Sequence, residues 1–247
     1  MDVVPTHCHG LDVHKKAVVA SVIVPDGKTG LQKETRTFGT MTSDLLALSD
    51  WLMGYGVTHV AMESTGEYWK PVFNILENNF EVLLVNAQHI KAVPGHKTDV
   101  KDSEWIAELL RHGLLKASFV PPLGQRELRE LTRYWSTFVR ERATLVNRVQ
   151  KVLESANIKL ASVATDVMGV SGRAMLEALI EGQASPAEMA ELAQKRMREK
   201  RELLVKALEG CVKPHHRFVL TELLCQIDNL DETIERFNQQ VEEYCRP

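Results

Sequence analysis

Residues 7–24 read His-Cys-His-Gly-Leu-Asp-Val-His-Lys-Lys-Ala-Val-Val-Ala-Ser-Val-Ile-Val, and the architecture of the chain follows from them. A short run at 7–13 and a run rich in β-branched residues at 17–24 flank a polar tripeptide, and Pro-Asp-Gly follows at 25–27. Runs bounded in this way are typical of a β-hairpin. Residues 33–38 alternate weakly and could add a third strand. The chain is therefore expected to open with a three-stranded antiparallel meander.

Helical and strand patterns alternate after the meander. They predict, in order, a helix at 42–56 capped by Thr42 or Ser43, a strand at 57–63, a helix at 68–76, a strand at 81–85 and a helix at 98–113. Residues 88–96 are expected to be a connector. The order β-β-β-α-β-α-β-α predicts a mixed sheet with helices packed on it. This α/β order resembles the ribonuclease H-like fold.

The last of these helices carries two acids close together, in the sequence Lys-Thr-Asp-Val-Lys-Asp-Ser-Glu-Trp-Ile-Ala-Glu-Leu-Leu-Arg-His-Gly at 97–113. At about 100° per residue, Asp99 and Asp102 fall on the side of the apolar residues. Two neighbouring carboxylates on a buried face need an arginine, a shared proton or a divalent metal to compensate them. The alternative is that the first turn projects beyond the core and both acids are solvated, favoured by the helix dipole.

The acids of the strands favour the first of these interpretations. Asp12 lies in the first strand and Glu63 ends the fourth, so their carboxylates approach each other if the two strands are neighbours. With Asp99 and Asp102 they make four acids from three elements, which is the pattern of a metal site. All-oxygen ligation selects Mg²⁺ or Mn²⁺. Two such ions can clamp the attacking and leaving oxygens of a DNA or RNA phosphodiester, which predicts phosphoryl transfer.

The second part of the chain has a different character. Pro121-Pro122-Leu123-Gly124 ends the α/β pattern and no convincing strand follows, which predicts a domain boundary between residues 1–120 and 121–247. Residues 125–160 have apolar residues three or four apart, as in a long amphipathic helix that could form half of a coiled coil. Further helices are expected at 174–180, 185–208 and 216–244.

Composition limits the possible classes of protein. The 247 residues are 44% apolar. No apolar run approaches the roughly 20 residues needed to cross a bilayer. The N-terminus has no basic segment that leads into a hydrophobic one. A cytoplasmic protein without membrane contact is therefore expected. The four cysteines are scattered, which suits a reducing compartment and argues against a structural zinc site. The net charge of −3 does not exclude nucleic acid, because binding depends on the local field.

Three motifs resemble those of a known family. They are Gly-Leu-Asp-Val-His-Lys at 10–15, Ala-Met-Glu-Ser-Thr-Gly at 61–66 and Lys-Thr-Asp-Val-Lys-Asp at 97–102, with further similar segments at 109–115 and 169–176. The chain resembles the DEDD transposases of the insertion-sequence-110 family, whose N-terminal domain is similar to RuvC-type Holliday-junction resolvases. The resemblance implies that Asp12, Glu63, Asp99 and Asp102 are the catalytic, metal-binding acids. It also implies a coiled-coil assembly region and a homo-oligomeric recombinase, dimer or tetramer, that binds DNA and a structured guide-type RNA.

The resemblance also implies something that the chain lacks. Family members resemble one another in a further C-terminal domain with a nucleophilic serine, so this chain is expected to be an N-terminal portion without it. Ser171 is not that serine, because no His or Asp partner can be argued for it. Gly169 and Gly172 predict a helix break there instead.

Basic residues in two places could contact nucleic acid. Lys15, Lys16, Lys97 and Lys101, with Lys91 and His96, surround the expected acidic rim and could hold phosphates or be solvated loop charges. In the long helix, Arg126, Arg129, Arg133 and Arg140 interleave with Tyr134 and Trp135 and could offer a cationic, stacking surface. Packing is the favoured interpretation for Trp135. His7 and His9 are interpreted as ordinary strand residues rather than zinc ligands.

The leading hypothesis is a metal-dependent DNA transposase or recombinase. The nearest alternative is a junction-resolving or ribonuclease H-type nuclease that uses the same four acids. An actin-like ATPase is disfavoured because Val13-His14-Lys15-Lys16 offers no glycine-rich phosphate turn after Asp12. A non-catalytic alternative is an interaction module that assembles with full-length transposase through its helices.

Overall fold

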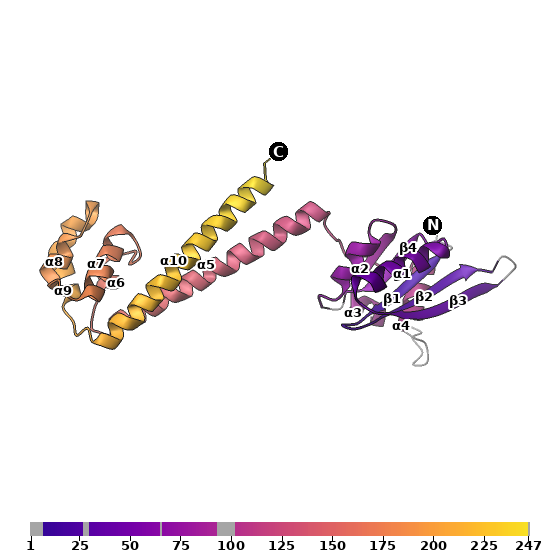
Figure 1. Ribbon diagram of the computed structural model, residues 1–247, viewed down its shortest axis with the longest axis horizontal. Helices are drawn as coiled ribbons and strands as arrows, with labels where there is room; N and C mark the ends of the chain where they lie inside the picture. Colours follow the sequence, from indigo (N-terminus) through magenta and orange to yellow (C-terminus); the bar gives the residue numbers. More distant parts are fainter. Residues whose placement is uncertain (1–6, 27–29, 65, 93–101, 247) are drawn as a thin grey trace. The chain divides into compact units, whose positions relative to one another are not determined.

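The chain forms two compact units, residues 1–120 and 121–247, each with its own core (Figure 1). The computed structural model describes residues 7–26, 30–64, 66–92 and 102–246. The first unit is a sheet with helices and the second is entirely helical in its described part. This confirms the prediction of an α/β part followed by an all-α part.

A five-stranded mixed sheet organises the first unit. Its strands are β1 Cys8–Val13, β2 Val18–Pro25, β3 Leu31–Phe38, β4 His59–Glu63 and β5 Glu81–Val85. They lie in the order β3-β2-β1-β4-β5. The three strands of the meander are antiparallel, whereas β4 runs parallel to both β1 and β5. The central strand β1 therefore joins the antiparallel half of the sheet to the parallel half.

Helices cover both faces of this sheet. On one face, α1 (Thr42–Gly54) and α2 (Trp69–Leu76) enclose a core with β1, β2 and β4. On the other, α4 (Asp102–Arg111) packs on Cys8 of β1 and Ala61 of β4. Pro71 is the third residue of α2, within the first turn as its lack of an N–H requires. A cysteine buried under α4 is inert, and burial raises the pKa of Cys8 to about 11.

Two local predictions for this unit were wrong. The connector expected at 88–96 contains a helix, α3 (Ala87–Ala92), which begins because the Asn86 carboxamide oxygen accepts the Gln88 N–H at 2.9 Å. The cap of α1 is not a hydroxyl of Thr42 or Ser43. The Met41 N–H instead donates to the Asp44 carboxylate at 3.3 Å, so the acid at the third helical position closes the turn.

The end of α4 is where the sequence predicts it. Gly113 has a left-handed φ of 67°, and the N–H groups of Gly113 and Leu114 donate to the carbonyls of Leu110 and Leu109, each at 3.0 Å. This is the Schellman arrangement that ends many helices at glycine. The expected start of the helix at Thr98 or Asp99 lies outside the described residues.

A pair of long antiparallel helices organises the second unit. They are α5 (Leu123–Ser155) and α10 (Pro214–Tyr244), seen side by side in Figure 1. The Trp135 indole N–H donates to the Asn238 side chain at 2.8 Å, and Phe138 and Phe237 have ring centroids 5.3 Å apart. The long amphipathic helix of the sequence is thus half of a two-helix hairpin within the chain, and Trp135 contacts the other half.

Short helices connect the two long ones, and their boundaries differ from the predictions. They are α6 Leu160–Val163, α7 Val170–Glu181, α8 Pro186–Glu191, the 3₁₀ helix η1 Lys195–Lys200 and α9 Arg201–Leu208. The long helix ends at Ser155 rather than 160, because Asn157 adopts a left-handed φ of 60°. The single helix expected at 185–208 is three elements, interrupted where Lys195 has a φ of 49°.

The helix break predicted near Ser171 lies at Gly169, the N-cap of α7, and not at Ser171 or Gly172. Ser171 and Gly172 lie in the first turn of α7, and Ser171 is buried, with its hydroxyl accepting the Gln194 N–H at 2.9 Å. A Cβ at Gly172 would lie 2.7 Å from the carbonyl carbon of Val167. The glycine therefore allows close packing inside a helix. Rejecting Ser171 as a nucleophile agrees with its buried, hydrogen-bonded position.

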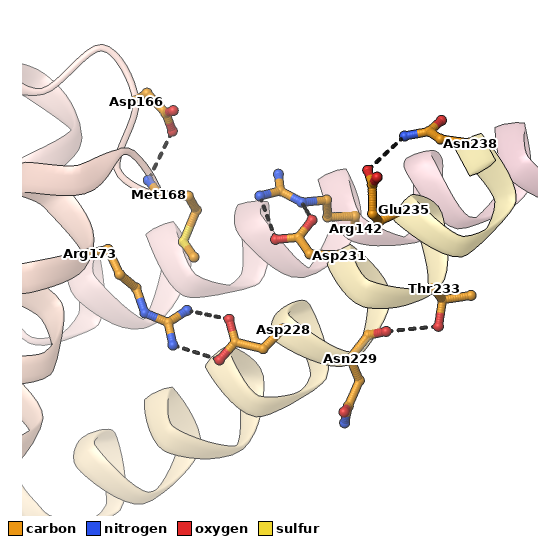
Figure 2. A network of polar contacts seen from close by, with 10 residues as sticks. All are labelled: Arg142, Asp166, Met168, Arg173, Asp228, Asn229, Asp231, Thr233, Glu235 and Asn238. Atoms are coloured by element: carbon orange, nitrogen blue, oxygen red, sulfur yellow. Dashed lines mark hydrogen bonds and ion pairs between the residues drawn. The ribbon is translucent and has the colours of Figure 1, made fainter. Parts of the chain in front are cut away.

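Two arginines tie the hairpin and α7 together (Figure 2). Arg173 of α7 donates to both carboxylate oxygens of Asp228 in α10, at 2.9 and 2.7 Å, and to Glu177 at 2.7 Å. Arg142 of α5 makes a similar two-bond contact with Asp231. These acids raise the pKa of both guanidinium groups. Each pair links helices that are distant in sequence.

We expect Asp228→Asn to lower the free energy of unfolding of the helical unit by roughly 0.5–1 kcal/mol, because the pair is bidentate but partly exposed. Glu177→Gln is the matched control, since it removes an exposed acid from the same arginine within one helix, and should cost roughly 0.3 kcal/mol. Helical circular dichroism during urea unfolding measures both values. Equal losses of unfolding free energy in the two variants would show that the ion pair between α7 and α10 stabilises the unit no more than the pair within α7.

Candidate metal centre beside β1, β4 and α4

Asp12 and Glu63 occupy corresponding positions on two adjacent parallel strands. The register pairs Gly10 with Ala61 and Leu11 with Met62, so the next residue on each strand is Asp12 and Glu63. Adjacent strands lie about 4.8 Å apart and side chains alternate between faces. Both carboxylates are therefore side by side, on the face of the sheet that α4 covers. Both are half-buried.

Gly10 brings α4 unusually close to the middle strand. A Cβ at Gly10 would lie 2.5 Å from the backbone nitrogen of Ala107, 3.0 Å from the Cβ of Ile106 and closer still to the carbonyl oxygen of Ser103. Only glycine leaves room for this contact. Since Gly10 is two residues before Asp12, the first turn of α4 lies beside the same end of the strand.

A row of hydroxyl groups sets the position of α4 over the sheet. The Ser103 hydroxyl lies 2.8 Å from that of Ser21 on β2, and Ser21 lies 2.8 Å from Thr35 on β3. Thr35 in turn donates to Glu104 at 3.1 Å. Each group finds a partner, and Ser21 and Ser103 are buried, so the row is stabilising and directional. Asp102 immediately precedes Ser103 and is exposed at the start of the described part of α4.

For Asp102 the structure agrees with the alternative interpretation, an exposed acid in the first turn, because its side chain is not part of the buried face. That face consists of Ser103, Ile106, Ala107, Leu109 and Leu110. Another side of α4 contacts β3, where Lys33 pairs with Glu108 at 2.5 Å. Asp99 lies outside the described residues. Within 7–26, 30–64, 66–92 and 102–246, no group of three or more His, Cys, Asp or Glu is arranged to hold a metal ion.

His14 is the described partner of Asp12. Its Nε2 lies 2.9 Å from Oδ2 of the carboxylate, so the imidazole N–H donates to the acid. His14 is exposed and follows directly after β1, and one carboxylate oxygen of Asp12 remains for another ligand. Carboxylates on neighbouring strands are the donor type that Mg²⁺ and Mn²⁺ prefer, so this donor set fits a hard divalent cation.

The structure describes only some of the basic residues that were predicted to contact nucleic acid. Lys15 and Lys16 are exposed in the turn after β1, next to Asp12 and His14. Arg129, Arg133 and Tyr134 are exposed on α5, and Arg126 is half-buried. Lys97, Lys101 and His96 lie outside the described residues, as does the Lys91 side chain.

Two buried histidines, His9 and His216, have structural positions. His9 is fully buried on the face opposite α4, 5.6 Å from Trp51 of α1, and neither ring nitrogen has a hydrogen-bond partner among the described residues. His216 accepts the Lys213 N–H at 3.2 Å and so caps α10. All four cysteines are free, and no described helix is long and apolar enough to cross a membrane.

A comparison with protein families finds one family that matches the chain. The model of the insertion-sequence-110 family of DEDD transposases, described as a transposase, matches residues 9–158. The chain belongs to this family. The match covers more than half of the chain and contains Asp12, Glu63, Asp99, Asp102 and all of α5. No curated protein matches the transposase chain. The family is one of DNA-recombining enzymes that depend on divalent metal ions.

The sequence did not indicate several residues that shape this site. Gly10 stands out only as part of a motif, although a glycine two residues before an acid in a strand is a signal of close backbone approach. Ser21 is hidden in an apolar strand, where a lone hydroxyl signals a buried polar partner. Ser103 and Thr35 carry no signal of their own.

Proposed function

We propose that residues 1–120 form the metal-dependent catalytic domain of the transposase, with a ribonuclease H-like (RuvC-like) fold that cleaves and transfers DNA strands. Asp12, Glu63, Asp99 and Asp102 hold Mg²⁺ or Mn²⁺, with two ions in the complete site. The observation that carries the proposal is the side-by-side placement of Asp12 and Glu63 on the α4 face, inside the region that matches the family. The strand order and the helices on both faces support the same fold.

The residues of the chain have separate tasks in this chemistry. Divalent ions bound by the four acids would activate the attacking oxygen and stabilise charge on the scissile phosphate. Asp12 and Glu63 present their carboxylates from rigid strands, which keeps the ligand positions fixed. His14 holds the Asp12 carboxylate by one oxygen. Lys15 and Lys16 are close enough in sequence to Asp12 to hold phosphates of the DNA backbone.

The helical unit would assemble the enzyme and contact nucleic acid. The α5–α10 hairpin leaves an open groove of about 390 Å³, lined by residues that include Glu141, Leu145 and Arg148 of α5 and Leu230 of α10. A groove that combines two leucines with charged and polar side chains suits another helix, which supports a dimer or tetramer. Arg129 and Arg133, with Arg126, offer cations to DNA or to a structured guide RNA.

Mn²⁺ binding and strand cleavage by the full chain test the catalytic proposal. We expect Asp12→Asn and Asp102→Asn each to weaken Mn²⁺ binding at least about tenfold, or roughly 1.4 kcal/mol, and to abolish metal-dependent cleavage of DNA. Thermal stability without metal should be unchanged or slightly higher, because neighbouring carboxylates repel each other. Electron paramagnetic resonance of free Mn²⁺ gives the affinity.

Asp50→Asn is the matched control, since Asp50 is an exposed acid on α1 in the same unit. It should leave Mn²⁺ affinity and cleavage unchanged. Unaltered Mn²⁺ affinity in both site variants would exclude the proposed centre and favour an assembly role for the chain. Cleavage confined to branched junctions would instead favour a resolvase-type nuclease.

A further inference from the structure

The strongest concentration of positive charge in the chain lies on η1 and the first residue of α9. Within 195–201 there are five bases and one acid, a local net charge of +4 in a chain whose net charge is −3. We call these bases the basic cluster: Lys195, Arg196, Arg198, Lys200 and Arg201. All except Arg201 are exposed. The cluster lies outside the segment that matches the family.

Few acids of the protein neutralise the basic cluster. Arg201 pairs with Glu191 at 2.7 Å. Arg198 and Lys200 donate instead to backbone carbonyls, of Ala193 at 3.2 Å and Val163 at 3.1 Å, which orient the cations without cancelling their charge. The side chains of Lys195 and Arg196 have no hydrogen bond or ion pair with another described residue. Most of the positive charge therefore remains available to a ligand.

The basic cluster is held on an ordered framework. The Gln194 N–H donates to the buried Ser171 hydroxyl at 2.9 Å, and Met197 packs against the core of the helical unit. The segment is thus fixed at its start and its middle. Holding like charges close together on a fixed element is electrostatically unfavourable. A bound polyanion offsets this repulsion by its attraction to each of the bases.

The basic cluster lies at the opposite end of α5 from Arg129 and Arg133. The Lys159 N–H donates to the Ala207 carbonyl at 2.7 Å, which places α9 beside the residues that directly follow α5. From Arg129 to Ser155 the helix rises about 39 Å at 1.5 Å per residue. Figure 1 shows α9 at this end of the hairpin. At about 3.4 Å per base pair, the separation corresponds to roughly 11–12 base pairs of duplex.

We propose that the basic cluster is a second nucleic-acid contact of the helical unit and binds the phosphodiester backbone. A duplex long enough to reach both ends of α5 would contact the cluster and the Arg126, Arg129 and Arg133 surface together. The proposal rests on the proposed function only in assuming that the chain binds nucleic acid. Contacts between exposed lysines or arginines and phosphates carry no sequence information. Binding by the basic cluster should therefore depend on salt and not on sequence.

Fluorescence anisotropy of the full chain with labelled nucleic acids tests the inference. The variant is Lys195→Gln/Arg196→Gln/Arg198→Gln, and the substrates are DNA duplexes of about 10 and about 24 base pairs and an RNA duplex of about 24 base pairs. For the long substrates we expect Kd to rise at least about tenfold. The slope of log K against log salt should fall by roughly 2–3, about 0.9 for each phosphate that the protein no longer neutralises. On the short DNA the effect should be at most about twofold, because the other surface still binds it.

The control variant removes three exposed bases elsewhere in the same unit, Lys151→Gln/Lys213→Gln/Arg236→Gln, and should change neither Kd nor the slope. Circular dichroism verifies that both variants are folded. A larger loss of affinity for the long DNA or for the long RNA identifies which polymer the basic cluster binds. Unchanged Kd and slope on both long substrates would overturn the inference, even if the wild type binds them. A wild-type chain that binds no nucleic acid would contradict the proposed function as well, so the two failures are distinguishable.

Discussion

Gly10→Ala should destabilise the first unit by about 3 kcal/mol or more and displace α4 from the sheet. The added Cβ meets backbone atoms of Ser103 and Ala107, which cannot swing aside as a side chain would. Overpacking of a rigid contact costs about 1–3 kcal/mol, and more where backbone must move. Tryptophan fluorescence during urea unfolding reports mainly on this unit, because Trp51, Trp69 and Trp105 lie within it and only Trp135 lies outside.

The same substitution has a consequence for the metal centre. The first turn of α4 carries Asp102 and rests on Gly10. Displacing this turn should therefore also weaken Mn²⁺ binding by folded Gly10→Ala protein. Gly54→Ala is the matched control, since no described heavy atom lies within 4 Å of its Cβ position. It should be neutral or slightly stabilising. A loss below about 1 kcal/mol for Gly10→Ala would mean that α4 adjusts freely, and would remove the argument that glycine positions Asp102.

The first unit was predictable because its local signals agree with one another. β-Branched runs, turn residues and the Gly113 stop each indicated the elements that are present, and their order indicated a mixed sheet. The sequence could not show how closely α4 approaches β1, since the Ser21, Thr35 and Ser103 contact joins three elements. Such contacts depend on tertiary packing, which local patterns do not encode.

Glycines and helical spacing misled the interpretation of the helical unit for a related reason. Gly169 and Gly172 favour a break on propensity alone. Gly169 does precede α7, but Gly172 lies within the helix, at a position where a larger residue would collide with Val167. Residues 185–208 have helical spacing, but the Ser171 bond to Gln194 and the left-handed Lys195 divide them. The basic residues thereby project from a short fixed element rather than lining one face of a long helix.

His9 should make the first unit sensitive to acid over a defined range. Complete burial lowers the pKa of His9 from 6.5 to about 3, because the charged imidazole would lose its hydration. The folded-state pKa of this base lies below its unfolded value, so the unfolded chain takes up a proton first as pH falls. The His9 contribution is therefore fully present above pH 6.5 and is lost between pH 6.5 and about 3. The slope is about 1.4 kcal/mol per pH unit, and the total is up to roughly 4–5 kcal/mol.

His9→Leu isolates this contribution from that of the carboxylates. The variant should be as stable as the wild type at pH 7 or more stable, because it removes two buried ring nitrogens without partners among the described residues. The difference in unfolding free energy should then widen in favour of the variant by about 1.4 kcal/mol for each pH unit below 6.5. His112→Gln, which removes an exposed histidine of the same unit, is the control for the loss of an imidazole. Parallel curves for wild type and His9→Leu from pH 7 to 5 would mean that water or a polar group reaches the ring, and that β1 is less tightly enclosed by α1 than its contact with Trp51 indicates.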